Sequence, residues 1–275
     1  MRCLTKTIHY TSDIPVRLVF FSDTHDGSRY FARNHFKKFL SSSMDHPNAW
    51  LLGIGDHVDA LVPADAKRFQ ISTVEERFLA SENPDEILDA QAKDFCQIMK
   101  PYQGRLLGLA MGNHEQAIGK RYGFSIHRQI CRDLECDDLG YTFLLLLKLT
   151  NPGYRHTRSV TIYGTHGFGG GGRTEGGSIT KYARAVQYYS ADIFLSGHDH
   201  DSWVKKVTRI GVNNSGKIQN RDLILANTGS FLKTLSEGAT PSWAETRGFP
   251  PRNLGGVVLE LKPDHHWWVN TSVID

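Results

Sequence analysis

The amino-acid sequence predicts an α/β fold in which buried strands alternate with helices and a second, mixed sheet follows. The first observation is that short apolar runs each end in small or polar residues and precede helix-like segments. Such runs are typical of strands covered on both faces. The second observation is that, after residue 200, strand patterns continue without long helices between them. The predicted strands of the first kind are Val16–Phe21, Trp50–Ile54, Leu106–Met111, Val160–Tyr163 and Ile193–Leu195.

Apolar residues at helical spacing predict the helices between these strands. The clearest begins with Asn83 as N-cap and Pro84 as first helical residue, and Pro101 closes it. The other predicted helices contain Phe36–Leu40, Ile126–Leu134 and Ile179–Tyr189, and the late strands are Trp203–Val212, Leu223–Ala226 and Val257–Leu261. Since no repeat or linker interrupts the pattern, we expect one domain over residues 1–275, with a helical insertion around residues 60–104.

Composition places the chain among ordinary globular proteins. Its 275 residues are 40% hydrophobic and 22% charged, which excludes disordered and coiled-coil classes. The net charge of +3 neither demands nor excludes a nucleic-acid partner. The longest apolar stretch, Phe143–Leu147, is too short to cross a membrane, and the N-terminus resembles no secretory signal. We therefore expect a cytoplasmic protein without a membrane partner.

Aspartate, asparagine and histidine gather where the predicted strands end. The segments in chain order are "DTH", "GDHVD", "GNHE", "GTHG" and "GHDH". Ligand sites of α/β sheets lie at the carboxyl ends of strands. Each segment alone is also compatible with a polar turn, but all five together, in this order, resemble the calcineurin-like metallophosphoesterases over about residues 16–200. The resemblance implies a four-layer α/β/β/α sandwich of two mixed β-sheets with flanking helices and a dinuclear metal site at strand ends.

The resemblance also implies a set of metal ligands. Asp56 would bridge two divalent ions, and the remaining ligands would be Asp23, His25 and His200 for one ion and Asn113, His166 and His198 for the other. Imidazole and carboxylate ligands without thiolates suit manganese, which we expect first, or iron, nickel or zinc. If D-x-H and H-x-H are extended, residues two apart face the same way, so each pair can face one centre.

Two further residues are predicted to act in catalysis. By resemblance, His114 contacts the substrate phosphate and assists the leaving group, and Asp59 holds His114. An imidazole suits this task because its ordinary pKa is near neutrality. The alternatives are that His114 only donates hydrogen bonds to the ligands and that Asp59 is a solvated acid. His57, between Asp56 and Asp59, is expected to be a packing residue or to lie at the outer rim of the site.

Substrate contacts are predicted from the segments around the site. Asn113 and His114 are candidates, as is Arg173 in the glycine-rich stretch Gly167–Gly177, which could instead form only a flexible loop. Lys67 and Arg68 are candidates within the expected insertion. Lys181 is expected to extend a basic rim or to lie on a solvated helix face.

The predicted function is metal-dependent hydrolysis of a phosphate ester by a metal-bridging hydroxide. A phosphodiester, in a nucleic acid or a nucleotide, is the first choice because no device for recognising a protein chain is evident. The alternatives are a phosphomonoesterase acting on proteins or small molecules and a catalytically inert scaffold of the same fold. A scaffold is expected to have lost ligands, whereas all of them are present here.

Overall fold

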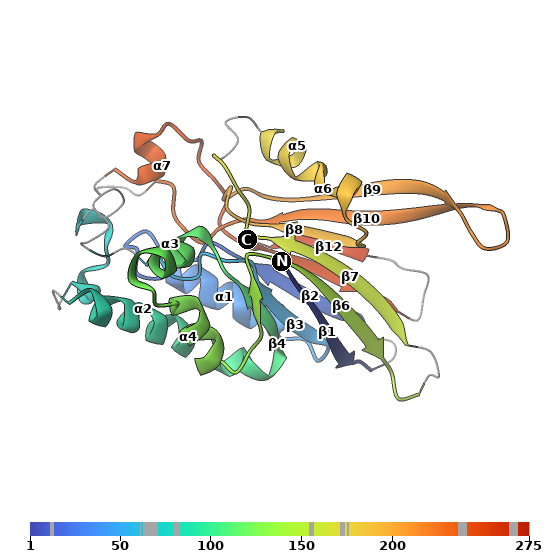
Figure 1. The fold of residues 1–275 in the computed structure, drawn as a ribbon, viewed down its shortest axis with the longest axis horizontal. Helices are drawn as coiled ribbons and strands as arrows, with labels where there is room; N and C mark the ends of the chain where they lie inside the picture. Colours follow the sequence, from blue (N-terminus) through green and yellow to red (C-terminus); the bar gives the residue numbers. More distant parts are fainter. Residues whose placement is uncertain are drawn as a thin grey trace.

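Two six-stranded sheets pack face to face, and helices cover the outer side of each (Figure 1). The computed structural model describes residues 1–11, 14–60, 62, 71–79, 83–153, 157–170, 174, 176–235, 241–263 and 269–274. The layers follow one another as helices, first sheet, second sheet and helices. This arrangement confirms the predicted four-layer α/β/β/α sandwich.

The first sheet brings three of the predicted strands together in parallel. Its strands in spatial order are β12 (Val269–Ile274), β11 (Gly256–Leu261), β2 (Val16–Phe21), β3 (Ala49–Gly53), β4 (Leu106–Ala110) and β5 (Asp138–Gly140). Strands β2 to β5 are parallel, and β11 is antiparallel to both of its neighbours. The carboxyl ends of β2, β3 and β4 therefore meet at one edge, where "DTH", "GDHVD" and "GNHE" begin.

The second sheet supplies the other two motif segments. Its strands in spatial order are β1 (Arg2–His9), β6 (Thr142–Thr150), β7 (Arg158–Thr165), β8 (Ile193–Ser196), β10 (Ile218–Thr228) and β9 (Ser202–Val212). Strands β7, β8 and β10 are parallel, so "GTHG" and "GHDH" follow neighbouring carboxyl ends. All five segments thereby come from strand ends of two packed sheets.

Strand β11 differs from the prediction that the late strands form the second sheet. Strands β9 and β10 do so, but β11 pairs with β2 of the first sheet, with Leu259 opposite Leu18. The reason is that both faces of β11 are apolar. Leu259 belongs to the core between the sheets, whereas Val258 belongs to the core beneath the helices. Such a strand needs cover on both sides, which a position beside β2 provides.

Strand β2 shows the same division of its side chains. Leu18 and Phe20 lie in the core between the sheets, and Val19 and Phe21 lie in the core on the helix side. All four side chains are fully buried. Because successive side chains of a strand point to opposite faces, an unbroken apolar run is required here.

Helices complete the outer layers. Those on the first-sheet side are α1 (Arg33–Met44), α2 (Pro84–Met99), α3 (Asn113–Tyr122) and α4 (Ile126–Asp133), and those on the second-sheet side are α5 (Gly177–Ala183) and α6 (Ala185–Tyr188). The remaining helical segments are α7 (Trp243–Thr246) and the 3₁₀ turns Ile71–Thr73, Glu76–Phe78 and Lys100–Arg105. Within the described ranges, no helix is long and apolar enough to cross a membrane.

Helix α2 begins as the sequence predicts. The Asn83 side chain accepts a hydrogen bond from the backbone N–H of Asp85 at 3.0 Å, and Pro84 is the first helical residue. The helix packs on the outer face of the first sheet through Leu88 and Phe95. The single domain and the insertion around residues 60–104 stay predictions, since residues 61, 63–70 and 80–82, with Lys67 and Arg68, lie outside the described residues.

Candidate metal centre

The segments that follow β2 and β3 are joined by backbone hydrogen bonds beyond the ends of the strands. The N–H groups of Asp23 and His25 donate to the carbonyls of Gly55 and Asp56, at 3.0 and 3.1 Å. The N–H of Asp26 donates in the same way to His57 at 3.1 Å. The "DTH" and "GDHVD" segments therefore form one supported layer, and their side chains are held in fixed relative positions.

The backbone of this layer is left-handed at the predicted ligands, not extended. Asp23, His25 and Asp56 have φ angles of 51°, 49° and 49°, and His198 and His200 have 70° and 54°. The expectation that D-x-H and H-x-H are extended is therefore wrong. Left-handed conformations are uncommon for residues other than glycine, although aspartate and histidine adopt them more readily than most. Each costs about 1–3 kcal/mol, so the surrounding structure must hold it in place.

Glycines allow the segments to approach each other closely. A Cβ atom at residue 112 would lie 2.0 Å from Oδ1 of Asp56, so a side chain there would displace that carboxylate. Gly55 has a φ of 97°, which favours glycine, and a Cβ atom added at this position would lie 2.5 Å from Nδ1 of His166. These glycines are required by the packing of the ligands themselves.

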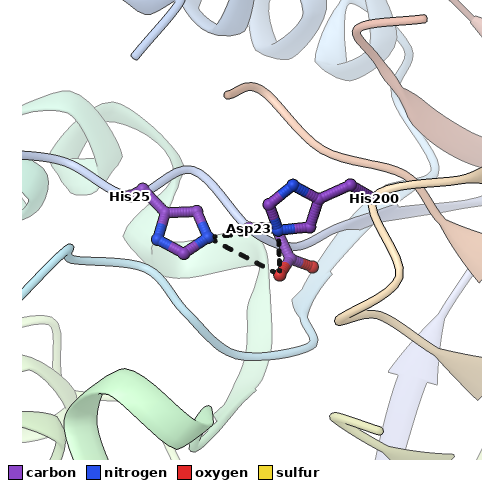
Figure 2. A group of neighbouring side chains, drawn as sticks. All are labelled: Asp23, His25 and His200. Carbon is purple, nitrogen blue, oxygen red and sulfur yellow. Dashed lines mark hydrogen bonds and ion pairs between the residues drawn. The ribbon is translucent and has the colours of Figure 1, made fainter. Parts of the chain in front are cut away.

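The first group of candidate ligands is Asp23, His25 and His200 (Figure 2). The Asp23 side chain is buried, and its Oδ2 accepts hydrogen bonds from the Ser22 hydroxyl and from the backbone N–H of His198. Its Oδ1 has no hydrogen-bond partner within the described part of the chain, and it lies 3.3 Å from Nε2 of His200 and 3.8 Å from Nε2 of His25. One carboxylate oxygen and two ring nitrogens thus converge on a common point.

The second group is Asp56, His166 and His198, and Asn113 lies beside it. Oδ2 of Asp56 is 3.2 Å from Nε2 of His166, and the same nitrogen is 3.0 Å from Oδ1 of Asn113. Oδ2 of Asp56 is also 3.9 Å from Nε2 of His25, which belongs to the first group. Asp56 therefore lies between the two groups, in the position required of a bridging ligand.

Hydrogen bonds to carbonyl oxygens fix which ring nitrogens carry protons. Nδ1 of His166 lies 2.8 Å from the carbonyl of Ile54, and Nε2 of His198 lies 2.7 Å from the carbonyl of Gly169. A carbonyl only accepts, so these nitrogens are protonated, and the other nitrogen of each ring is left for a metal ion. In the same way, Nδ1 of His25 lies 3.1 Å from Oδ1 of Asp59. Each ring is oriented as a ligand before any ion binds.

Electrostatics keep the buried carboxylates ionised. Burial alone would raise the pKa of Asp56, but the facing rings of His166 and His114 hold this pKa well below its usual range. Burial is likewise outweighed at Asp23, whose pKa is lowered by His200. Burial opposes protonation of His166, but the charge of Asp56 raises its pKa to about 9. The carboxylates therefore require positive charge beside them, which protonated rings or divalent ions supply.

The donor atoms fit a pair of divalent cations. The groups consist of imidazole nitrogens, carboxylate oxygens and one amide oxygen, a set that suits borderline ions such as manganese or zinc. The unpartnered Oδ1 of the buried Asp23 is a vacant acceptor, which is costly unless a cation or a proton donor satisfies it. We conclude that the donor atoms of the two groups fit a pair of divalent ions.

Comparison with known proteins identifies the family. The model of the calcineurin-like phosphoesterase family matches residues 16–202. The chain belongs to this family. Its members usually hydrolyse phosphate esters and use a dinuclear centre of divalent metal ions, so the protein is a metal-dependent phosphoesterase. No curated protein matches the sequence.

Solved structures similar to this phosphoesterase are distant in sequence. A metallophosphoesterase from Sphaerobacter thermophilus has 10% identity and a TM-score of 0.36, and the match covers 94% of this chain and 88% of that one. The NAD nucleotidase of Haemophilus influenzae has 9% identity and a TM-score of 0.44, with 94% and 49% covered. The nuclease MPE of Pseudomonas putida has 10% identity and a TM-score of 0.32, with 92% and 87% covered.

The two predicted catalytic residues lie together, but their contact differs from the prediction. Nδ1 of His114 is 2.6 Å from the backbone carbonyl of Asp59 and 3.4 Å from its Oδ1. The Asp59 carboxylate is closer to His25, at 3.1 Å. Asp59 therefore holds His114 chiefly through its main chain, and its side chain orients a candidate metal ligand. Nε2 of His114 faces Asp56 at 4.0 Å.

Other predicted residues have roles outside the ligand set. His57 is fully buried, stacks on Phe95 and lies 3.1 Å from the Ala110 carbonyl, as expected of a packing residue. Lys181 extends no basic rim and lies on no solvated face, because it is paired with the buried Asp199 at 2.5 Å. Arg173 lies outside the described residues, so its contact with substrate stays a prediction.

Glu115 is a functional residue that the sequence analysis did not assign. Its carboxylate is buried and accepts hydrogen bonds from four backbone N–H groups. Three of them belong to residues 56–58, at 3.2, 2.6 and 3.3 Å, and the fourth belongs to Gly112, at 2.8 Å. Glu115 thus joins the "GDHVD" segment to the start of α3. Its place in "GNHE" was the one signal in the sequence, because three of its four donors follow a different strand.

Replacing Glu115 with glutamine is expected to weaken metal binding. The amide would direct N–H groups at backbone donors, so at least two hydrogen bonds to a charged acceptor are lost, at about 1.5–3 kcal/mol each. We expect a lower melting temperature and about 10- to 100-fold weaker affinity for added manganese. Calorimetric titration with manganese measures the affinity, and Glu245→Gln, at an exposed position, is the matched control. Equal affinities in both variants would contradict this role.

Proposed function

We propose that the protein hydrolyses a phosphodiester, in a nucleic acid or a nucleotide, and that the ligands of its two metal ions are those that the sequence predicts. The observation that supports a diester over a monoester is that basic side chains beside the ligands are paired with aspartates of the protein. Asp26 follows the ligand His25, and Asp199 and Asp201 lie on either side of His200. Each of these three aspartates has a basic partner.

The three pairs are close. Arg33 lies 2.8 Å from Asp26, Lys181 lies 2.5 Å from Asp199, and Arg252 lies 2.9 Å from Asp201, the six residues forming separate pairs. Asp26 also faces Arg77 at 3.8 Å. On the described segments, the basic partners of the aspartates beside His25 and His200 are therefore engaged with carboxylates of the protein.

Substrate charge then distinguishes the two ester classes. A phosphomonoester carries nearly two negative charges at neutral pH, whereas a diester carries one. A monoester therefore demands an additional cation, typically an arginine that contacts the phosphate with two N–H groups. Since the basic residues beside the described ligands are paired internally, the site is better matched to the singly charged diester.

The chain's own residues divide the remaining tasks. When bound, two divalent ions would stabilise negative charge on the phosphate and would lower the pKa of an attacking water molecule. Asp56 is anchored for its bridging position by the backbone N–H of His114, which donates to its Oδ1 at 2.9 Å. The ring of His114 is fixed by the Asp59 carbonyl, so its Nε2 can donate a proton to the leaving oxygen.

An activity panel with added manganese tests this proposal. We expect bis(p-nitrophenyl) phosphate to give a kcat/KM at least tenfold higher than p-nitrophenyl phosphate, because the monoester's second charge has no cationic partner. Single- and double-stranded DNA, RNA and cyclic nucleotides then narrow the class of diester. A higher kcat/KM for the monoester would overturn the proposal in favour of a phosphomonoesterase.

A further inference from the structure

Strands β9 and β10 form a long antiparallel hairpin that projects from the second sheet (Figure 1). The strands pair from Ser202 opposite Thr228 to Val212 opposite Ile218. On its other side, β10 pairs with β8 only through residues 224–227. The outer part of the hairpin, residues 208–222, is therefore a two-stranded ribbon that extends beyond the body of the protein (Figure 1), whereas Val207 and Leu223 still pack in the core of the second-sheet side.

The hairpin concentrates the positive charge of the chain. Residues 202–228 contain five basic residues and one acid, Asp222, which gives a net charge of +4, against +3 for the whole chain. Lys206 is paired with Asp222 at 2.7 Å, and Arg221 is paired with Asp192 at 2.5 Å. Within the described residues, the other three have no ion pair; they are Lys205, Arg209 and Lys217.

The register places two arginines against each other on one face of the ribbon. Arg209 is directly opposite Arg221, and Lys205 lies on the same face, four residues before Arg209. Like charges directly opposite each other destabilise a strand pair, and Asp192 offsets only the charge of Arg221, which leaves Arg209 to attract a further anion. The other face presents the exposed side chains of Ile210, Val212 and Ile218.

We propose that the β9–β10 hairpin binds duplex DNA, with the ribbon lying in the major groove and its free cations against phosphates. The major groove of B-DNA accommodates a two-stranded β-ribbon, and Lys and Arg supply most of the affinity for its backbone. A second copy of this chain is a poorer partner for the ribbon, because two hairpins of charge +4 repel each other. The proposed binding of DNA does not depend on the proposed diester activity; only the hydrolysis of the bound DNA does.

The position of the hairpin relative to the metal centre sets the length of DNA required. Strand β9 begins two residues after the ligand His200, and β10 returns to the same end of the sheet, so the tip is far from the centre. Each strand has 11 residues, which at about 3.3 Å per residue gives roughly 35 Å. At about 3.4 Å per base pair, a duplex of roughly ten base pairs or more is needed to contact both.

The binding test compares two triple variants of equal charge. Lys205→Ala/Arg209→Ala/Lys217→Ala removes the free cations of the hairpin, and Lys37→Ala/Lys38→Ala/Lys148→Ala removes three exposed cations elsewhere. Fluorescence anisotropy measures affinity for a 25-base-pair phosphorothioate duplex at several salt concentrations. We expect about tenfold weaker binding per lost phosphate contact near 0.1 M salt, and a salt slope reduced by nearly one for each contact. The control should bind like the unaltered protein.

Turnover separates this proposal from the diester proposal. In the hairpin variant, kcat/KM for bis(p-nitrophenyl) phosphate should be unchanged, while kcat/KM for a 25-base-pair duplex should fall and that for a 6-base-pair duplex should not. Failure of every diester to react would refute the diester proposal and leave the binding result intact. Equal affinity of the two triple variants would overturn the role of the hairpin. A second result would also overturn this role: the protein forms a dimer that the variant Ile218→Asp dissociates, and removal of the three cations leaves the affinity for DNA unchanged.

Discussion

Replacing Asp56 with asparagine is expected to lower kcat for a diester by about a thousandfold. The variant removes the only charge that faces both groups of ligands, since Oδ2 of Asp56 lies 3.2 Å from His166 and 3.9 Å from His25 within the described site. It also places an amide N–H₂ against ring nitrogens or against the N–H of His114. Metal ions contribute several kcal/mol of transition-state stabilisation, and 1.36 kcal/mol corresponds to one decade of rate.

Metal analysis and a matched variant show whether this loss comes from the bridge. Elemental analysis should find about two manganese ions per chain in the unaltered protein and fewer in Asp56→Asn. Asp45→Asn, at an exposed position, should retain full activity and metal content. Thermal melting followed by circular dichroism should show a folded variant. An unchanged rate, or a thousandfold loss with both ions retained, would contradict the bridging role.

The strands of the fold could be predicted from the sequence because each one follows a local pattern. The apolar run Val16–Phe21 is covered on both faces, and the structure shows this directly in the division of its side chains between two cores. The pairing of β11 with β2 could not be predicted in the same way. A strand that is apolar on both faces pairs where both of its faces become buried, and here the partner strand is about 240 residues away in the sequence. Local sequence patterns do not identify such a partner.

The candidate site was predictable as a set of residues but not as a geometry. The five motif segments supplied Asp56 and the other members of the two groups. The left-handed backbone at Asp23 and His25 was not foreseen, because it depends on hydrogen bonds to the segment after β3. The role of Glu115 was missed for the same reason, as three of its four donors lie more than 50 residues away.

Charge partners were the least predictable feature. The helical pattern around Lys181 predicts a basic rim or a solvated helix face. Its partner Asp199 lies within "GHDH", 18 residues further along the chain, and is buried. A helical pattern predicts on which side of the helix a side chain lies, but it does not predict which residue from another element contacts that side chain. The pairing matters because it engages the charge of Lys181 with a carboxylate of the protein.

Replacing His114 with alanine is expected to lower kcat by about 10²–10⁴-fold for esters with a poor leaving group. The ring is 18% exposed, which leaves it accessible beside the buried ligands, and its Nε2 faces Asp56 at 4.0 Å. The variant keeps the backbone N–H that donates to Asp56, so the bridging carboxylate retains its anchor. Metal content should therefore stay at two ions per chain, in contrast to Asp56→Asn.

The dependence on the leaving group distinguishes proton donation by His114 from a purely structural role. A p-nitrophenolate departs without a proton, so the loss of rate for bis(p-nitrophenyl) phosphate should be small, whereas an alkoxide, such as the sugar oxygen of a dinucleotide, needs the proton. Comparing the two substrates in His114→Ala and in the unaltered protein measures this difference. An equal loss for both substrates would show that His114 stabilises the phosphate or the ligands and does not assist the leaving group.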